Sequence, residues 1–209
     1  RSVCTGFCVA DSVIATAAHC LFRTAGERRP KLRNFHFVMG NAHKTTAGSE
    51  RVLARIAGYR QRSPGQYVLA GSIAPRVEPP IDATSDWALM RLDRPACKGK
   101  ALEVEAASPA EIARYASRRQ LYNVAFHRDF RDWSLAVSGP CDAQAATQQD
   151  AAARITRDFS APEQLVLHTC DTGGASSGSP LMVMHASGKW SVVGLNVGTY
   201  VQTRVLMEK

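Results

Sequence analysis

Long apolar runs are missing from this 209-residue chain. No stretch approaches the roughly 20 consecutive apolar residues that a membrane-spanning helix needs, so no helical membrane span is expected. No charged and then apolar leader opens the sequence, and no internal repeat is visible. The six cysteines form no Cys-x-x-Cys pair, so no structural zinc site or other metal site is expected.

Basic residues exceed acidic ones, giving a formal net charge of +8. The excess is mostly arginine, clustered in residues 23–33, 55–62 and 114–131. These clusters fall in several predicted loops and carry neither zinc-finger spacing nor the aromatic signature of RNA-binding modules. We therefore predict a solvated basic surface and no nucleic-acid partner.

An even number of cysteines favours disulfides, and hence a secreted or periplasmic protein in an oxidising compartment. Six cysteines allow fifteen pairings, so their number does not assign them.

Short apolar or alternating runs, punctuated by Gly, Pro, Asn and Asp, recur along the chain and predict an all-β protein. Helical periodicity is confined to residues 109–117, which follow the capping residue Ser108, and to the Ala/Gln-rich residues 143–157, which are equally compatible with a mobile insertion. The predicted strands are residues 3–10, 13–17, 34–39, 52–57, 86–92, 121–126, 134–137, 164–168, 181–184, 191–197 and 200–205.

Three distant segments carry a serine, a histidine and an aspartate. They are Thr16-Ala-Ala-His-Cys20, Ser85-Asp-Trp-Ala-Leu89 and Asp171-Thr-Gly-Gly-Ala-Ser-Ser-Gly-Ser-Pro180. A serine hydroxyl becomes a useful nucleophile when an imidazole takes its proton and a carboxylate orients that imidazole. Each segment alone would more often be an ordinary core, cap or turn sequence. Their joint occurrence favours catalysis.

Together with residues 192–198, these segments make the chain resemble the chymotrypsin-like (trypsin-like) serine peptidases. The resemblance is to bacterial secreted members that have Ser-Gly-Ser-Pro in place of Ser-Gly-Gly-Pro. It implies two antiparallel six-stranded β-barrels with the active site in the cleft between them. The lobes would be residues 1–107 and 118–209, joined by a linker at 108–117. We expect the first strand and the C-terminal end of the family's domain to be missing.

The resemblance also implies a serine endopeptidase that works through an acyl-enzyme and needs no cofactor. Its triad would be His19, Asp86 and Ser177, and the backbone N–H groups of Ala175 and Ser177 would form the oxyanion hole. Its partners would be protein or peptide substrates and protein inhibitors, and we expect a monomer. Two other classes stay open: a catalytically inactive homologue that acts as a binding or adhesion protein, and an esterase.

Disulfide pairing follows from the same resemblance, because the family joins the histidine-bearing loop through the cysteines that correspond to Cys4 and Cys20. We pair Cys141 with Cys170, since both precede the nucleophile loop in the expected second lobe. Cys8 and Cys97 then form the third pair.

Two residues depart from the family pattern. Ser176 replaces the Asp that pairs with a newly cut N-terminal amine in trypsin-like zymogens, so activation by that ion pair is not expected. Ala175 replaces a Gly, and its Cβ restricts the turn that brings the N–H into the oxyanion hole. We therefore expect a hole that forms only when substrate binds.

The substrate-binding residues implied by the resemblance are Asp171, Thr172, Asn196, Val197 and Gly198. Asp171 stands where trypsins carry the pocket-floor Asp that selects basic side chains. Asn196 stands where glutamate-specific bacterial relatives place a His, so an acidic preference is disfavoured. A basic preference and a small or neutral preference both remain open.

Overall fold

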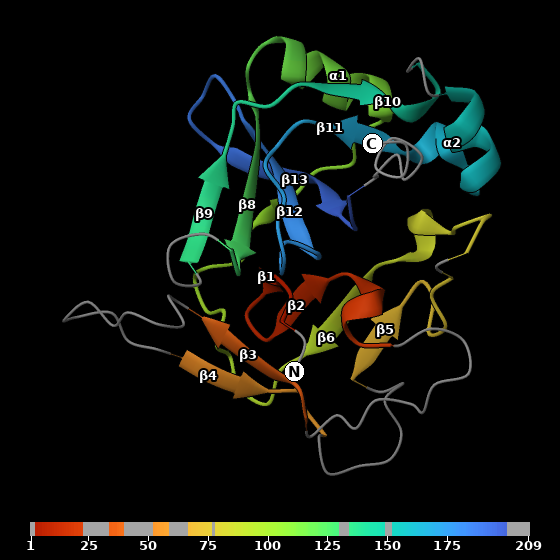
Figure 1. Cartoon of the computed structure of the whole chain (residues 1–209). Helices are drawn as coiled ribbons and strands as arrows, with labels where there is room; N and C mark the ends of the chain where they lie inside the picture. Colours follow the sequence, from red (N-terminus) through yellow and green to blue (C-terminus); the bar gives the residue numbers. More distant parts are fainter. Residues whose placement is uncertain are drawn as a thin grey trace.

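Short strands dominate the architecture of the protein. The computed structural model describes residues 3–22, 34–39, 52–58, 67–76, 78–129, 134–148 and 152–199. Figure 1 shows sheets with a few short helices, so the protein is mostly β, as the sequence predicts.

The N-terminal half contains a four-stranded antiparallel sheet in the order β1-β2-β6-β5. In β2 three consecutive residues are buried, as expected for a central strand whose two faces are both covered. A separate pair, β3 and β4, lies beside it. The strands are β1 (Phe7–Ala10), β2 (Val13–Thr16), β3 (His36–Met39), β4 (Val52–Arg55), β5 (Val68–Ala70) and β6 (Ala88–Arg91).

The C-terminal half contains a five-stranded sheet in the order β7-β13-β12-β8-β9. Its β8 strand alternates strictly between buried and half-buried residues, as a strand with one face toward the core should. A further pair, β10 and β11, lies near α1. The strands are β7 (Glu103–Val104), β8 (Leu121–His127), β9 (Ser134–Ser138), β10 (Ala143–Ala145), β11 (Val166–His168), β12 (Ser179–Met184) and β13 (Trp190–Asn196).

Two closed six-stranded barrels are not present in the described part of the chain. Its strands form open sheets of four, five, two and two strands. One strand also pairs in a direction that an all-antiparallel barrel excludes, because β7 runs parallel to β13.

The two predicted helical segments have different outcomes. Residues 109–117 form α1 (Pro109–Ser117), whose N-terminus has a complete capping box between Ser108 and Glu111. The prediction for residues 143–157 is largely wrong. That segment holds β10, the 3-10 helix η5 (Ala146–Gln148) and only then α2 (Ala152–Asp158). Its Ala-rich start pairs with β11 instead.

Each half has a hydrophobic core of its own. The N-terminal core surrounds Ile14, Ile56 and Leu92, and the C-terminal core surrounds Leu121, Leu181 and Val183. Backbone hydrogen bonds join the halves at two places. Thr5 N–H donates to the Ser177 carbonyl (2.9 Å), and Ile81 N–H donates to the Asp158 carbonyl (2.8 Å). The relative placement of the halves is therefore fixed by direct main-chain contacts.

Three disulfides join Cys4 with Cys20, Cys8 with Cys97 and Cys141 with Cys170. These are the three expected pairs. The first joins the segment before β1 to the residue after His19, and the second joins β1 to the segment after β6.

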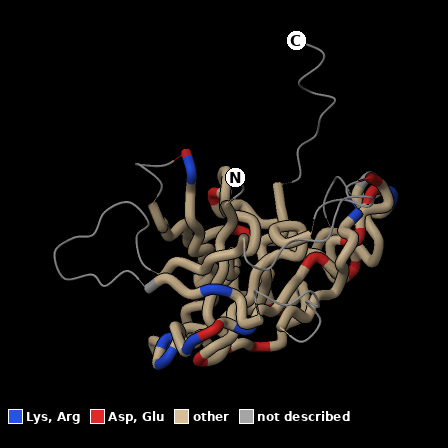
Figure 2. Tube along the Cα trace, turned by 90° about the horizontal axis from the view of Figure 1, so that it is seen from below, with Lys and Arg blue, Asp and Glu red and all other residues tan. Residues whose placement is uncertain are grey.

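The described lysines and arginines are spread along the chain trace and interspersed with acidic residues (Figure 2). Of the three arginine-rich clusters, residues 23–33 lie outside the described residues, and the other two are described in part. The predicted strand at residues 200–205 also lies outside them. Within the described ranges, no helix has the length and apolar character needed to cross a membrane.

Gly178 lies where the two halves are in close contact. We predict that Gly178→Ala strongly destabilises the protein. Gly178 has φ +83°, and an added Cβ would lie 2.2 Å from Thr16 Oγ1 and 2.4 Å from the Thr5 carbonyl oxygen. Left-handed strain together with overpacking should lower the free energy of unfolding by about 3 kcal/mol, measured by urea denaturation.

Gly188→Ala is the matched control, since Gly188 has φ +79° and open space where the Cβ would be. It should show only the cost of the backbone conformation, about 1–2 kcal/mol. Equal losses in the free energy of unfolding for the two variants would contradict the close packing at Gly178.

Candidate active site

Asp86 holds His19 by two hydrogen bonds. The imidazole Nδ1 lies 2.6 Å from Asp86 Oδ2, and the backbone N–H of His19 donates to Oδ1 at 2.8 Å. The Asp86 side chain is 13% exposed and the His19 side chain 33% exposed. A half-buried pair with a second, backbone anchor has little freedom to rotate.

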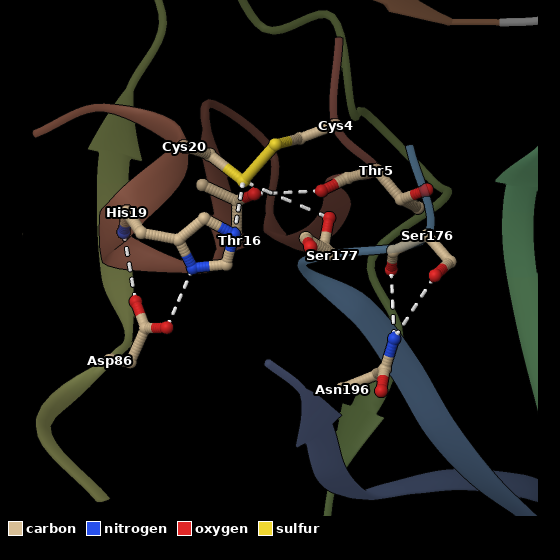
Figure 3. Close-up of polar contacts among 9 residues, drawn as sticks. All are labelled: Cys4, Thr5, Thr16, His19, Cys20, Asp86, Ser176, Ser177 and Asn196. Atoms are coloured by element: carbon tan, nitrogen blue, oxygen red, sulfur yellow. Dashed lines mark hydrogen bonds and ion pairs between the residues drawn. A yellow bond between two sulfur atoms is a disulfide. The ribbon is translucent and has the colours of Figure 1, made fainter. Parts of the chain in front are cut away.

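This geometry sets the role of each imidazole nitrogen. A carboxylate only accepts hydrogen bonds, so its partner Nδ1 carries the hydrogen and Nε2 presents a lone pair. Figure 3 shows Asp86 on one side of the imidazole and Ser177 on the other. The imidazole is therefore oriented to accept a proton on the side where Ser177 lies.

His19 is placed by the end of a buried strand. β2 ends at Thr16, and the chain turns at once into the 3-10 helix η1 (Ala18–Cys20). Ala17 and Ala18 are fully buried, and the Cys4–Cys20 disulfide fixes the residue that follows His19. The apolar strand therefore ends in the core with the imidazole at its boundary.

Asp86 follows the 3-10 helix η4 (Ala83–Ser85), which has its own cap. The Asp82 carboxylate accepts from the backbone N–H of Ser85 at 3.1 Å and from the Thr84 hydroxyl at 2.9 Å. These hydrogen bonds, first of all those with Ser85, lower the pKa of Asp82 below its ordinary value. The turn that delivers Asp86 to His19 is thus closed by an ionised neighbour.

Ser177 lies in a tight turn just before β12. Its carbonyl accepts from Thr5 N–H (2.9 Å), and the next residue, Gly178, donates to the Asn196 carbonyl (2.7 Å). Main-chain hydrogen bonds thus hold both polar groups of the peptide bond that follows Ser177. The Ser177 hydroxyl itself makes no hydrogen bond to any residue that the structure describes, His19 included.

The backbone N–H groups of Ala175 and Ser177 are also free of partners among the described residues. Ala175 has φ +86°, in the region that glycine normally occupies. The Ala175 backbone therefore adopts, despite its Cβ, the conformation that a glycine would adopt there. Two unpaired donors next to a serine are what an oxyanion requires.

Asn196, predicted to bind substrate, is 4% exposed and contacts the turn that carries Ser177. Its side-chain amide donates to the carbonyl of Ser176 at 3.2 Å and to the Ser176 hydroxyl at 3.3 Å. It also hydrogen bonds with His168, whose Nδ1 is buried without a partner. Burial lowers the pKa of His168, and the Asn196 hydrogen bond partly offsets that effect.

The other predicted substrate-binding residues lie on two adjoining segments. The Thr172 and Thr199 hydroxyls are 2.9 Å apart, which joins the segment before the Ser177 turn to the segment after β13. Asp171 and Gly198 are exposed, and Val197 is half-buried. The Asp171 carboxylate has no partner among the residues described.

Cys4, His19 and Cys20 bring two sulfur atoms and a nitrogen within 4.8 Å of one another. Both sulfur atoms are bonded in the disulfide, so neither offers the thiolate that a metal ion needs. This group has no capacity to hold zinc while the disulfide is intact.

Thr5 was missed by the sequence predictions, although it contacts the turn that carries Ser177 at two points. Its hydroxyl donates to the Ala175 carbonyl at 2.8 Å and its N–H donates to the Ser177 carbonyl. The available signal was its place next to Cys4, whose disulfide partner follows His19. That signal was too weak to assign a role.

Comparison with known proteins gives one family. A family model described as a trypsin-like peptidase domain matches residues 4–195. No curated protein matches the sequence. Among solved structures, one described as "Structure of Glu endopeptidase in complex with MPD" matches with probability 1.00, a TM-score of 0.49 and 14% sequence identity, covering 95% of this chain and 75% of the other.

The half-buried His168, whose Nδ1 is buried, predicts a pH dependence of stability. Its pKa is lowered in the folded protein, so on acidification the unfolded chain binds the proton first and the free energy of unfolding falls as the pH drops below about 6.5. We expect His168→Gln to remove up to about 1.4 kcal/mol per pH unit of that slope, measured by urea denaturation between pH 7 and pH 5.

The exposed His36 provides the control, because His36→Gln also removes one histidine but leaves His168 in place. An unchanged slope in His168→Gln would contradict the pKa shift.

Proposed function

Because the chain belongs to the trypsin-like peptidase family, we propose that it is a serine endopeptidase that hydrolyses peptide bonds through an acyl-enzyme. The proposal rests on the two hydrogen bonds that His19 donates to Asp86, with Ser177 on the opposite side of the imidazole. An ordinary core histidine has no need of a carboxylate on one side and an unpaired serine hydroxyl on the other.

The mechanism assigns one role to each residue. Ser177 Oγ attacks the scissile carbonyl carbon while His19 Nε2 takes the hydroxyl proton. The C–N bond then breaks, His19 gives that proton to the departing amine, and an ester joins the substrate to Ser177. Water repeats the sequence, with His19 again as the base, and releases the acid. Asp86 holds the imidazole in the required tautomer and stabilises its charged form throughout.

The negative charge that develops on the substrate oxygen is held by the N–H groups of Ala175 and Ser177. Both groups are unpaired among the described residues, so neither has to give up a bond before it acts. Each such donor is worth roughly 3–4 kcal/mol of transition-state stabilisation.

The hydrogen bond between Ser177 and His19 forms, in this mechanism, when substrate binds. Hydrogen bonds between catalytic groups are often long in free enzymes and shorten in the Michaelis complex. Formation of this hydrogen bond depends on the relative position of the two halves, because His19 and Asp86 lie in one half and Ser177 lies in the other. A shift of about 1 Å can cost about a hundredfold in rate.

Activation does not use the ion pair of trypsin-like zymogens. Ser176 occupies the position of the pairing Asp, and its hydroxyl and carbonyl face the neutral amide of Asn196. A new N-terminal amine would find no carboxylate at this position. We therefore propose an enzyme whose competence does not depend on a newly cut terminus.

Cleavage after basic residues is the specificity that Asp171 supports best. Its carboxylate is exposed and has no partner within the described part of the chain. An unpaired carboxylate beside the nucleophile turn favours Arg or Lys by charge pairing. The three disulfides support an oxidising compartment, outside the cell or in the periplasm.

Ser177→Ala is the first test of the function. We expect the wild-type protein to react with a fluorophosphonate probe and to hydrolyse casein, and the Ser177→Ala variant to do neither while keeping its circular dichroism spectrum and melting temperature.

Asp86→Asn should retain the fold and lose about four orders of magnitude in kcat, because the imidazole loses the acceptor that fixes its tautomer.

Failure of the wild-type protein to react with the probe would instead support the inactive, binding homologue. Reaction with nitrophenyl esters but not with any peptide would support the esterase.

Asp171→Asn tests the specificity. A library of fluorogenic peptides that differ only before the cut should give the wild type its highest kcat/KM with Arg or Lys, and Asp171→Asn should lower that value about tenfold or more with little change for neutral residues. Equal loss for every peptide would place Asp171 in the scaffold and not in the specificity pocket.

A further inference from the structure

Ala175 needs a restraint that the triad does not supply. A residue with a Cβ is disfavoured at positive φ, and Ala175 has φ +86°. Its N–H is one of the two donors of the proposed oxyanion hole. Relaxation of Ala175 to an ordinary conformation would turn that donor away, so some contact must hold it in place.

Three hydrogen bonds hold the peptide groups on either side of the Ala175 Cα. On one side the Gly174 carbonyl accepts from Arg128 N–H at 2.8 Å. On the other side the Ala175 carbonyl accepts from the Thr5 hydroxyl at 2.8 Å, and Ser176 N–H donates to the Gly173 carbonyl at 3.1 Å. Together these bonds restrict the rotation about the intervening backbone. Only the bond from Thr5 comes from a side chain.

The Thr5 hydroxyl is itself fixed in direction. It accepts from the backbone N–H of Phe126 at 2.9 Å, so its hydrogen is left to point toward the Ala175 carbonyl. Thr5 is 6% exposed, which limits competition from water. Its backbone is held too, since Thr5 N–H donates to the Ser177 carbonyl and the Thr5 carbonyl accepts from the Thr16 hydroxyl at 2.7 Å.

These contacts connect three parts of the proposed site. Thr5 follows Cys4, whose disulfide partner Cys20 follows His19. Through Thr16 it contacts the strand that leads to His19 (Figure 3). Through Ala175 and Ser177 it contacts the turn that carries the proposed nucleophile. Of the residues at this junction, Thr5 alone bonds by its side chain to the Ala175 carbonyl in the described chain.

We propose that Thr5 is the positioning residue of the oxyanion hole. Its hydroxyl holds Ala175 in the left-handed conformation, so that the hole is formed without glycine and without an ion pair to a new N-terminus. Thr5 touches no reacting atom in this role. The inference rests on the proposed peptidase function and adds to it the device that keeps the hole open.

Thr5→Val removes the hydroxyl and keeps the side-chain shape. We expect kcat on a peptide nitroanilide to fall about tenfold to a hundredfold, less than the loss of an oxyanion donor itself, with KM within about twofold. Inhibition by a peptide aldehyde, whose hemiacetal oxygen occupies the hole, should weaken in parallel. Thr5→Ser, which keeps the hydroxyl, should restore most of kcat.

Ser191→Ala is the matched control, since it removes a buried hydrogen bond from the Ser191 hydroxyl to Glu105 (2.7 Å) and leaves every contact of Thr5 in place. It should lower the melting temperature as Thr5→Val does, with little change in kcat. In the Ala175→Gly background the effect of Thr5→Val on kcat should shrink, because glycine adopts positive φ without restraint.

Crystal structures of the wild type and Thr5→Val separate this inference from the proposed function. The variant should show Ala175 outside the positive-φ region, whether or not the wild type has activity. An Ala175 that keeps its φ in Thr5→Val, or a kcat no lower than that of Ser191→Ala, would overturn the role of Thr5. A wild-type protein that neither turns over peptides nor reacts at Ser177 would overturn the peptidase function alone.

Discussion

The double hydrogen bond between Asp86 and His19 is the interaction on which the proposed chemistry depends. It joins a side chain and a main-chain N–H to one carboxylate, so the imidazole has a fixed position and a fixed tautomer. The strand β2, the turn η4 and the Cys4–Cys20 disulfide all serve to keep these two residues in contact. Without that contact, the imidazole Nε2 would have no fixed direction. Ser177 would then lack a positioned base in the proposed mechanism.

The second requirement is that the two halves, which have separate cores, keep their relative position. Each half has its own core, and the main-chain contacts of Thr5 and Ile81 join them. Gly178 lies at the first of these junctions, where an added Cβ would meet Thr5 and Thr16. The turn that carries Ser177 is therefore positioned by the opposite half as well as by its own sheet. Neutral hydrogen bonds to Ala175 and Ser176 shape that turn.

Local patterns in the sequence were sufficient for many elements. The strand β8 alternates as predicted, and α1 begins at the predicted Ser108 cap. Short strands such as β5 and β7 were missed because two or three residues carry too little periodicity and depend on distant partners. The segment 143–157 was assigned by its Ala-rich composition, but pairing with β11 outweighs that weak preference. Motifs marked the triad candidates, whereas the contacts of Thr5 and Asn196 arise only in the folded chain.

In the proposed mechanism Ser177 becomes covalently acylated with His19 as its base. Pre-steady-state turnover of a nitrophenyl ester, followed by acid quench and peptide mass mapping, detects this acyl-enzyme. We expect a burst of one nitrophenol per molecule and an acyl group on the peptide containing Ser177, lost again on incubation at neutral pH. A burst without an adduct at Ser177, or an adduct on a different side chain, would contradict it.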